Sequence, residues 1–176
     1  SIVVDFFVRA WGIGHLGFGQ AAALPLASDR YRSAIIARVL RLNCLTKDYA
    51  PLWRRLWNHE TAKASWVAHD DRLSPWPSGA ASWSRDVGLR TYFERRRALV
   101  ELDVLAALEL GISIDELCTI YRTQFPVLRD YEQNTWYDQN GRIVFTTNRG
   151  LPGVGLDRKT FEAWQDALEA GIAPPE

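Results

Sequence analysis

The sequence from Phe93 to Thr147, FERRRALVELDVLAALELGISIDELCTIYRTQFPVLRDYEQNTWYDQNGRIVFTT, decides the fold because its local signals agree. Apolar residues recur at helical spacing through its first part. Gly111 follows the last of them, where glycine readily adopts the positive φ that ends a helix. Ser113 and Glu116 then have the S-x-x-E spacing of a capping box that opens a second helix. The predicted order is helix, short turn, helix.

A β-hairpin is predicted to follow the second helix, which ends at Pro126 in this prediction. Two short runs rich in aromatic and β-branched residues, 135–137 and 143–145, flank Asn140-Gly141, a pair typical of tight turns. The predicted fold class is therefore mainly α with a small β-hairpin (α+β), a helix–turn–helix followed by a hairpin, winged-helix-like, in a helical domain.

The helical periodicity also predicts which side chains face the core. In the first helix, counted from Leu99, these are the apolar residues at i, i+1, i+5, i+6 and i+9. In the second helix they are the apolar residues between 114 and 121. The predicted buried positions are Leu99, Val100, Val104, Leu105 and Leu108, followed by Ile114, Leu117, Ile120 and Tyr121.

Composition divides the chain at a stretch rich in Asp, Ser, Pro and Gly. Residues 67–85 are predicted to be a loop or linker, between a helical segment at 1–66 and the helix–helix–hairpin module at 86–176. We expect the two flanking segments to pack into one compact unit. The chain has no Met and begins on an apolar run, which predicts that it is a fragment of a larger protein.

The overall composition excludes several classes of protein. With 176 residues, 47% of them hydrophobic and 24% charged, the chain can bury a core and is not disordered. Two cysteines do not make a disulfide framework, and no signal peptide or membrane span is visible. These features predict a cytoplasmic protein.

Motifs for catalysis or metal binding are weak. Residues 12–17 (GIGHLG) match G-x-G-x-x-G, but Pro25 interrupts the helix that a dinucleotide site needs, which favours a plain glycine loop. A small nucleotide-using enzyme built on this loop is an alternative. The pairs at His59-Glu60 and His69-Asp70 lack the spacing of a metal site, so no metal ligand is predicted.

Basic side chains are concentrated in the first part of the chain. Residues 1–97 carry 15 basic and 8 acidic side chains, whereas residues 98–176 carry 6 basic and 13 acidic ones. A positively charged half suits contact with a polyanion such as DNA. Attraction between two halves of one domain is the alternative.

Ten arginines are candidate DNA-binding residues. Those in the first part could form a phosphate-facing surface, which supplies affinity without reading the sequence. Those near the second helix and the hairpin could reach a groove of DNA if this module docks as a winged helix does. Pairing with glutamates inside the protein would use the same charges. The candidates are Arg38, Arg41, Arg54, Arg55, Arg95, Arg96, Arg97, Arg122, Arg142 and Arg149.

Two stretches carry a resemblance to a known family. The first contains Val4–Ala10, Ala23–Leu26, Leu42–Thr46, Tyr49-Ala50 and Leu52-Trp53. The second contains Leu102-Asp103, Leu110–Leu117, Ile120-Tyr121 and Gln124–Leu128. Both are similar to the C-terminal region of large bacterial DNA adenine-N6 methyltransferases. These are the single-chain enzymes of type IIG restriction–modification and of phage-defence systems such as BREX and DISARM.

The resemblance implies a non-catalytic part of such an enzyme, which binds DNA or acts as a scaffold. The family's catalytic Asn-Pro-Pro-aromatic motif is absent, since no Asn-Pro occurs in the chain, and no catalytic residue can be assigned. The implied partners are double-stranded DNA and the methyltransferase core, with no membrane. S-adenosylmethionine would belong to the parent protein and no cofactor to this chain. A protein–protein interaction or structural module without DNA contact is the alternative.

Overall fold

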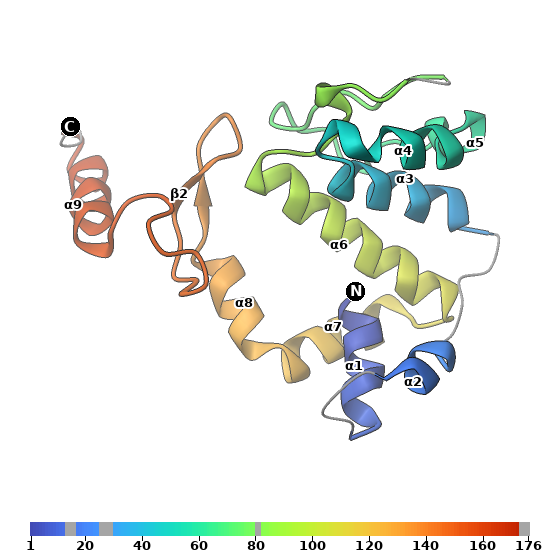
Figure 1. Cartoon of the computed structure of the whole chain (residues 1–176). Coiled ribbons are helices and arrows are strands. Elements are labelled where there is room, and N and C mark those ends of the chain that lie inside the picture. Colours follow the sequence, from blue (N-terminus) through green and yellow to red (C-terminus); the bar gives the residue numbers. More distant parts are fainter. Residues whose placement is uncertain (13–16, 25–29, 80–81, 173–176) are drawn as a thin grey trace.

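The structure is a computed structural model that describes residues 1–12, 17–24, 30–79 and 82–172. Most of the glycine loop at 12–17 and the predicted break at Pro25 lie outside these residues. The described part is mainly helical with a small two-stranded antiparallel sheet, which confirms the predicted fold class at that level (Figure 1). None of the described helices is long and apolar enough to cross a membrane.

The elements follow one another with short connections, apart from the long segment before α6. The helices are α1 (Ile2–Ala10), α2 (Phe18–Ala22), α3 (Arg32–Asn43), α4 (Ala50–Leu56), α5 (His59–Ala62), α6 (Tyr92–Glu109), α7 (Ile114–Gln124), α8 (Pro126–Gln133) and α9 (Arg158–Glu169). Two 3-10 turns are η1 (Lys47–Tyr49) and η2 (Arg85–Val87), and the strands are β1 (Trp136–Tyr137) and β2 (Ile143–Phe145).

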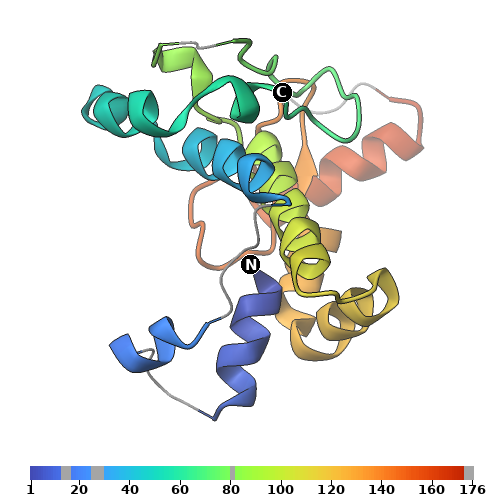
Figure 2. The same cartoon turned by 90° about the vertical axis from the view of Figure 1, so that its right-hand side faces the viewer.

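Helix α6 runs through the middle of the helical body. It packs against α3 on one side and against α1 and α7 on the other (Figures 1 and 2). The core is accordingly divided. One cluster lies around α3 and α4, where the rings of Trp53 and Trp57 stack with centroids 4.4 Å apart. A second joins α1, α6 and α7 through Val3, Ala107 and Leu117. A third cluster, around Ala98, joins α6 to α3, so α6 contributes to two of these three clusters.

The buried face of α6 is not the one that periodicity predicts. Leu99 and Leu108 are 44% and 48% exposed. The buried positions are two alanines and three acidic residues: Ala98, Ala107, Glu94, Glu101 and Asp103. The small side chains let neighbouring helices approach closely, and the three carboxylates each accept hydrogen bonds from neighbouring segments. A pattern of apolar residues cannot reveal such a face.

The turn between α6 and α7 matches the prediction, but the end of α7 does not. Gly111 has φ +69°, and Ser113 and Glu116 form a capping box at the start of α7. Leu117 is buried as predicted, whereas Ile114 is 62% exposed. Pro126 does not simply stop the chain's helical course: it is the first residue of α8, where a missing N–H is not needed. The observed order is three helices and then the hairpin.

The hairpin contacts the N-terminal end of α6. Its Asp138–Gly141 turn closes through a hydrogen bond from the Gly141 amide to the Asp138 carbonyl, 3.1 Å long. The Gly141 carbonyl in turn accepts a hydrogen bond from the Phe93 amide, also 3.1 Å long. The rings of Phe93 and Tyr137 meet edge to face at 5.5 Å. The tip of the hairpin is thus held against α6, about 45 residues earlier in the chain.

The carboxylate of Glu94 joins this end of α6 to the preceding segment. It accepts hydrogen bonds from the amides of Ser74 (2.9 Å), Arg90 (3.3 Å) and Thr91 (3.1 Å). Burial alone would raise the pKa of Glu94. The hydrogen bonds from Ser74 and Thr91 outweigh that effect, so the pKa lies below its ordinary value of 4.5.

We predict that substituting Gly141 by Ala destabilises the protein more than substituting Gly153 does. Both glycines have positive φ, +72° and +74°, so an alanine at either is strained by about 1–2 kcal/mol. A Cβ at Gly141 would also lie 3.0 Å from the Thr91 hydroxyl oxygen and 3.1 Å from Phe93 Cβ. A Cβ at Gly153 would have no heavy atom of another residue within 4 Å beyond its chain neighbours. Overpacking at Gly141 should add about 1–3 kcal/mol, measured by urea unfolding. Equal losses would show that the tip does not press on α6.

We also predict that Glu94→Gln lowers the free energy of unfolding at pH 7 and that this loss shrinks in acid. A carboxylate whose folded-state pKa is lowered stabilises the fold above its unfolded-state pKa. That contribution disappears as pH falls through the folded value, below 4.5. Urea unfolding at pH 7 and in steps down to pH 3 measures the difference. Glu162→Gln, at an exposed position, is the control. If the difference in free energy of unfolding between the wild type and Glu94→Gln stayed constant down to pH 3, the lowered pKa of Glu94 would be contradicted.

Candidate nucleic-acid interface

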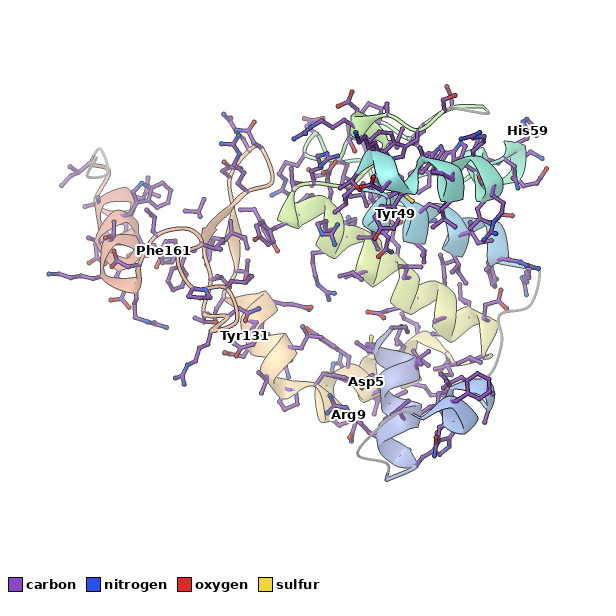
Figure 3. The ribbon with its side chains drawn as sticks, viewed as in Figure 1. Asp5, Arg9, Tyr49, His59, Tyr131 and Phe161 are labelled. Atoms are coloured by element: carbon purple, nitrogen blue, oxygen red, sulfur yellow. The ribbon has the colours of Figure 1, made fainter. Side chains whose placement is uncertain are left out.

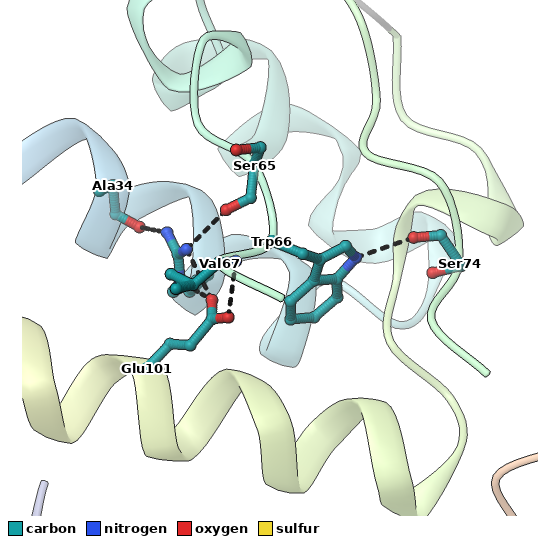
Figure 4. Close-up of polar contacts among 7 residues, drawn as sticks. Ala34, Ser65, Trp66, Val67, Ser74 and Glu101 are labelled. Carbon is teal, nitrogen blue, oxygen red and sulfur yellow. Dashed lines mark hydrogen bonds and ion pairs between the residues drawn. The ribbon is translucent and has the colours of Figure 1, made fainter. Parts of the chain in front are cut away.

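The first candidate, Arg38, lies inside the protein. It is 3% exposed and forms an ion pair with Glu101 of α6, in which Nε donates to a carboxylate oxygen at 2.7 Å. Its other nitrogens donate to the carbonyls of Ala34 (3.0 Å) and Ser65 (2.8 Å), as Figure 4 shows. Each of its three guanidinium nitrogens thus donates a hydrogen bond to another protein group. Arg38 therefore lies inside the helical body and not on a surface that DNA could reach in this structure.

Arg41, one turn further along α3, is also buried. Its guanidinium group lies against the indoles of Trp66 and Trp76, with 5.3 and 4.8 Å to the ring centroids. It donates hydrogen bonds to the Val87 carbonyl (3.0 Å) and to the Ser74 hydroxyl (2.7 Å). Burial lowers the pKa of Arg41 to about 10, so the group remains charged at neutral pH. Arg41 is thus also away from the surface, and it holds the 65–76 segment onto α3.

The run Arg95-Arg96-Arg97 does not form one basic surface, because successive residues of a helix point in directions about 100° apart. Arg95 donates to the carbonyls of Leu42 (2.8 Å) and Leu89 (3.2 Å). Arg96 forms an ion pair with Glu132 on α8. Arg97 is half-buried. Arg95 and Arg96 thus connect α6 to its neighbours.

Five of the predicted arginines have exposed side chains. Arg54 and Arg55 are on α4, whereas Arg122, Arg142 and Arg149 lie on what we call the C-terminal arm, residues 114–172. No carboxylate within the described ranges lies at ion-pair distance from any of these five. Two further exposed cations of the arm, Arg129 and Lys159, share this property and are not among the predicted residues.

A polar groove on the arm brings two arginines together. It has a volume of about 670 Å³ and is open to solvent, and Arg149 and Arg158 both line it, Arg158 also forming an exposed ion pair with Glu162 at 3.5 Å. Pro126 and Val127 of the first turn of α8 form part of its wall. This helix begins without a side-chain cap, so its N-terminal end carries unpaired partial positive charge. The groove also contains Asp130, which reduces its net positive charge.

This geometry suits an anion better than a covalent reaction. Two guanidinium groups and a helix N-terminus are recurrent features of phosphate contacts. The part of the chain that the structure describes holds no group of three or more His, Cys, Asp or Glu side chains placed to bind a metal ion. Arg158, which is one of the two groove arginines, is not among the predicted residues. The groove forms from three parts of the chain: α8, the segment that follows β2, and α9. No local sequence pattern predicts that these three parts meet.

Comparison with known proteins finds no family, no curated protein and no solved structure that matches this chain.

We predict that Arg38→Ala lowers the free energy of unfolding by about 3–5 kcal/mol, because it leaves the Glu101 carboxylate buried without its cation. Arg54→Ala removes an exposed arginine of the same charge and should change stability by no more than about 0.5 kcal/mol. Urea unfolding of both variants provides the comparison. Equal stability of the two variants would show that the ion pair contributes little to the fold.

Proposed function

We propose that this chain is the non-catalytic, DNA-binding C-terminal part of a DNA adenine-N6 methyltransferase of bacterial restriction–modification or phage defence. Its role is to position double-stranded DNA for a methyltransferase core, which binds S-adenosylmethionine. The observation that carries the proposal is the groove where Arg149 and Arg158 meet the first turn of α8. The similarity of two stretches of sequence to this family gives the proposal its class of enzyme.

The proposed contact is electrostatic and directed at the DNA backbone. Arginines on the arm neutralise phosphates and release condensed counterions, which gives affinity that depends strongly on salt. Arg122 on α7 and Arg142 at the hairpin tip extend the same arm on either side of α8. Such contacts fix the orientation of the duplex and leave sequence readout to other parts of the enzyme.

A winged-helix-like docking would use the helix directly before the hairpin. That helix is α8, and its exposed side chains include Val127, Arg129 and Gln133. In this arrangement α8 faces the major groove and the hairpin contacts the adjacent backbone. Arg142 lies at the tip of that hairpin, where a wing meets phosphates.

A protein–protein interaction module is the second candidate, and exposed apolar side chains favour it. Phe18 on α2 is 91% exposed, and Trp136, Leu168 and Ile172 of the arm are 51%, 50% and 64% exposed. Apolar side chains in these positions suit a partner surface such as that of the methyltransferase core. This candidate predicts binding that is insensitive to salt.

We predict that a double substitution, Arg149→Ala with Arg158→Ala, weakens binding of a labelled DNA duplex at least tenfold at low salt. It should also reduce the slope of log K against log salt by roughly 1.8, because each lost phosphate contact contributes about 0.9. Fluorescence anisotropy across a salt series measures both quantities on the full chain.

The matched control is Arg9→Ala with Lys63→Ala, which also removes two exposed positive charges, each of them paired with a carboxylate in the fold. The control should keep the affinity and slope of the wild type. No binding by the wild type even at low salt, or equal losses in the two double variants, would refute the proposal and favour the protein-interaction candidate.

A further inference from the structure

A separate cavity lies between α6, α8 and the hairpin. It has a volume of about 220 Å³. Its walls come from three elements that are distant in sequence, which the hairpin–α6 contact brings together. Apolar side chains cover much of its surface: Leu99, Leu128, Ile143 and Leu151.

Three tyrosines line this cavity, one from each of its walls. Tyr92 begins α6, Tyr131 is on α8 and Tyr137 is on β1; Figure 3 shows Tyr131 at the junction of α8 and the hairpin. None of the three hydroxyl groups has a hydrogen-bond partner among the described residues. Tyr137 is half-buried, and its hydroxyl, like that of any tyrosine, is protonated at neutral pH and can donate a hydrogen bond. These hydroxyls reach solvent, so a ligand with polar edges would replace water as their hydrogen-bond partner.

The cavity and the polar groove of the arm lie on opposite sides of the segment 146–149. Thr146 and Asn148 line the cavity, whereas Thr147 and Arg149 line the groove. This alternation is the one expected for extended backbone, where successive side chains point to opposite sides. Tyr131 lines both spaces, so they adjoin at α8.

The size and lining of the cavity limit what can occupy it. A volume of about 220 Å³ is below the roughly 300–1,000 Å³ of pockets that take a whole drug-sized ligand, so one or two fused rings fit rather than a peptide segment. Tyrosine faces and apolar walls favour a flat ring, and hydroxyl groups favour ring edges with donors and acceptors. Arg95 and Arg96 line the side formed by α6, where the Glu132 carboxylate, also in the lining, pairs with Arg96.

We propose that this cavity binds a single unpaired nucleobase, stacked on tyrosine and hydrogen-bonded at its edges by the free hydroxyls. The inference rests on the proposed DNA contact for its source of bases: a phosphate in the groove and a base in the cavity belong to neighbouring parts of one strand. A free nucleoside offers the same ring chemistry and is the other possible source.

The test compares two labelled duplexes of the same sequence, one fully paired and one with a single-base bulge. The full-length chain is expected to bind the bulged duplex roughly tenfold more tightly, in line with the value of one base–aromatic stack. Tyr92→Leu, at a tyrosine that lines the cavity and not the groove, should abolish this preference and leave the affinity for the paired duplex unchanged. Tyr49→Leu, at a partly exposed tyrosine outside the cavity, should keep the preference. Thermal unfolding checks that both variants are folded.

A titration with free adenosine and thymidine distinguishes the source of the base and is independent of the groove arginines. Nucleoside binding that Tyr92→Leu abolishes assigns the cavity to a free base, and a preference for the bulge without nucleoside binding assigns it to a base within DNA. Absence of both overturns the proposal, even if the paired duplex binds normally. Binding of a proline-rich peptide in place of either ligand would also overturn it. Failure of the duplex alone, with nucleoside binding intact, would instead contradict the proposed function.

Discussion

The buried ion pair between Arg38 and Glu101 is the interaction on which the helical body depends. It joins α3 to α6, and it also binds the connecting segment, because the second carboxylate oxygen accepts a hydrogen bond from the Val67 amide at 3.0 Å. Two charges removed from water are tolerated only when their remaining hydrogen-bonding groups are satisfied. The carbonyls of Ala34 and Ser65 complete the arginine's partners. A chain that failed to place all three segments together would leave a charge buried and unpaired.

Besides the packing of α7 on α6, two contacts hold the C-terminal arm to α6. At one, Arg96 of α6 pairs with Glu132 of α8, and Glu132 also accepts a hydrogen bond from the Tyr121 hydroxyl on α7. At the other, the hairpin tip rests on the start of α6 through Gly141. Beyond these points, α9 packs on the hairpin through the stacked rings of Phe145 and Phe161, whose centroids are 4.2 Å apart (Figure 3). The tyrosine-lined cavity lies between α6, α8 and the hairpin, and the groove lies on the other side of α8 and the segment after β2. The contacts that hold the arm therefore also set the shape of both spaces.

The local features of the fold could be predicted from the sequence because their causes are local. The Gly111 turn, the Ser113–Glu116 capping box and the Asn140-Gly141 hairpin each depend on a few neighbouring residues. The positions of Arg38 and Arg41 could not be predicted in this way. An arginine is buried only when a carboxylate, carbonyls or indoles from elsewhere surround it, and those partners are up to 63 residues away. The tryptophan-rich stretch before α6 was the available signal, since its indoles cover these arginines.

The candidate site was less predictable than the fold for the same reason. Arg142 and Arg149 could be named because they lie in or beside a recognisable hairpin. Arg158 could not, because nothing in its own surroundings places it in a groove with Arg149. The wide charge imbalance between the two halves of the sequence was a poor guide. Two of the basic side chains before residue 98, Arg38 and Arg41, are buried inside the protein, whereas the exposed cations of the arm lie in the half that is acidic overall.

The position of α1 has a consequence for the order in which the protein folds. Val3 is fully buried against α6 and α7, and the Ile2 amide binds a carboxylate oxygen of Asp103, 101 residues later in the chain. At roughly 5–20 residues per second, a ribosome needs on the order of 5–20 s to make that intervening stretch. During this interval α1 is an amphipathic segment without a docking surface. Although α1 is synthesised first, it can join this core only after α6 and α7 have been made.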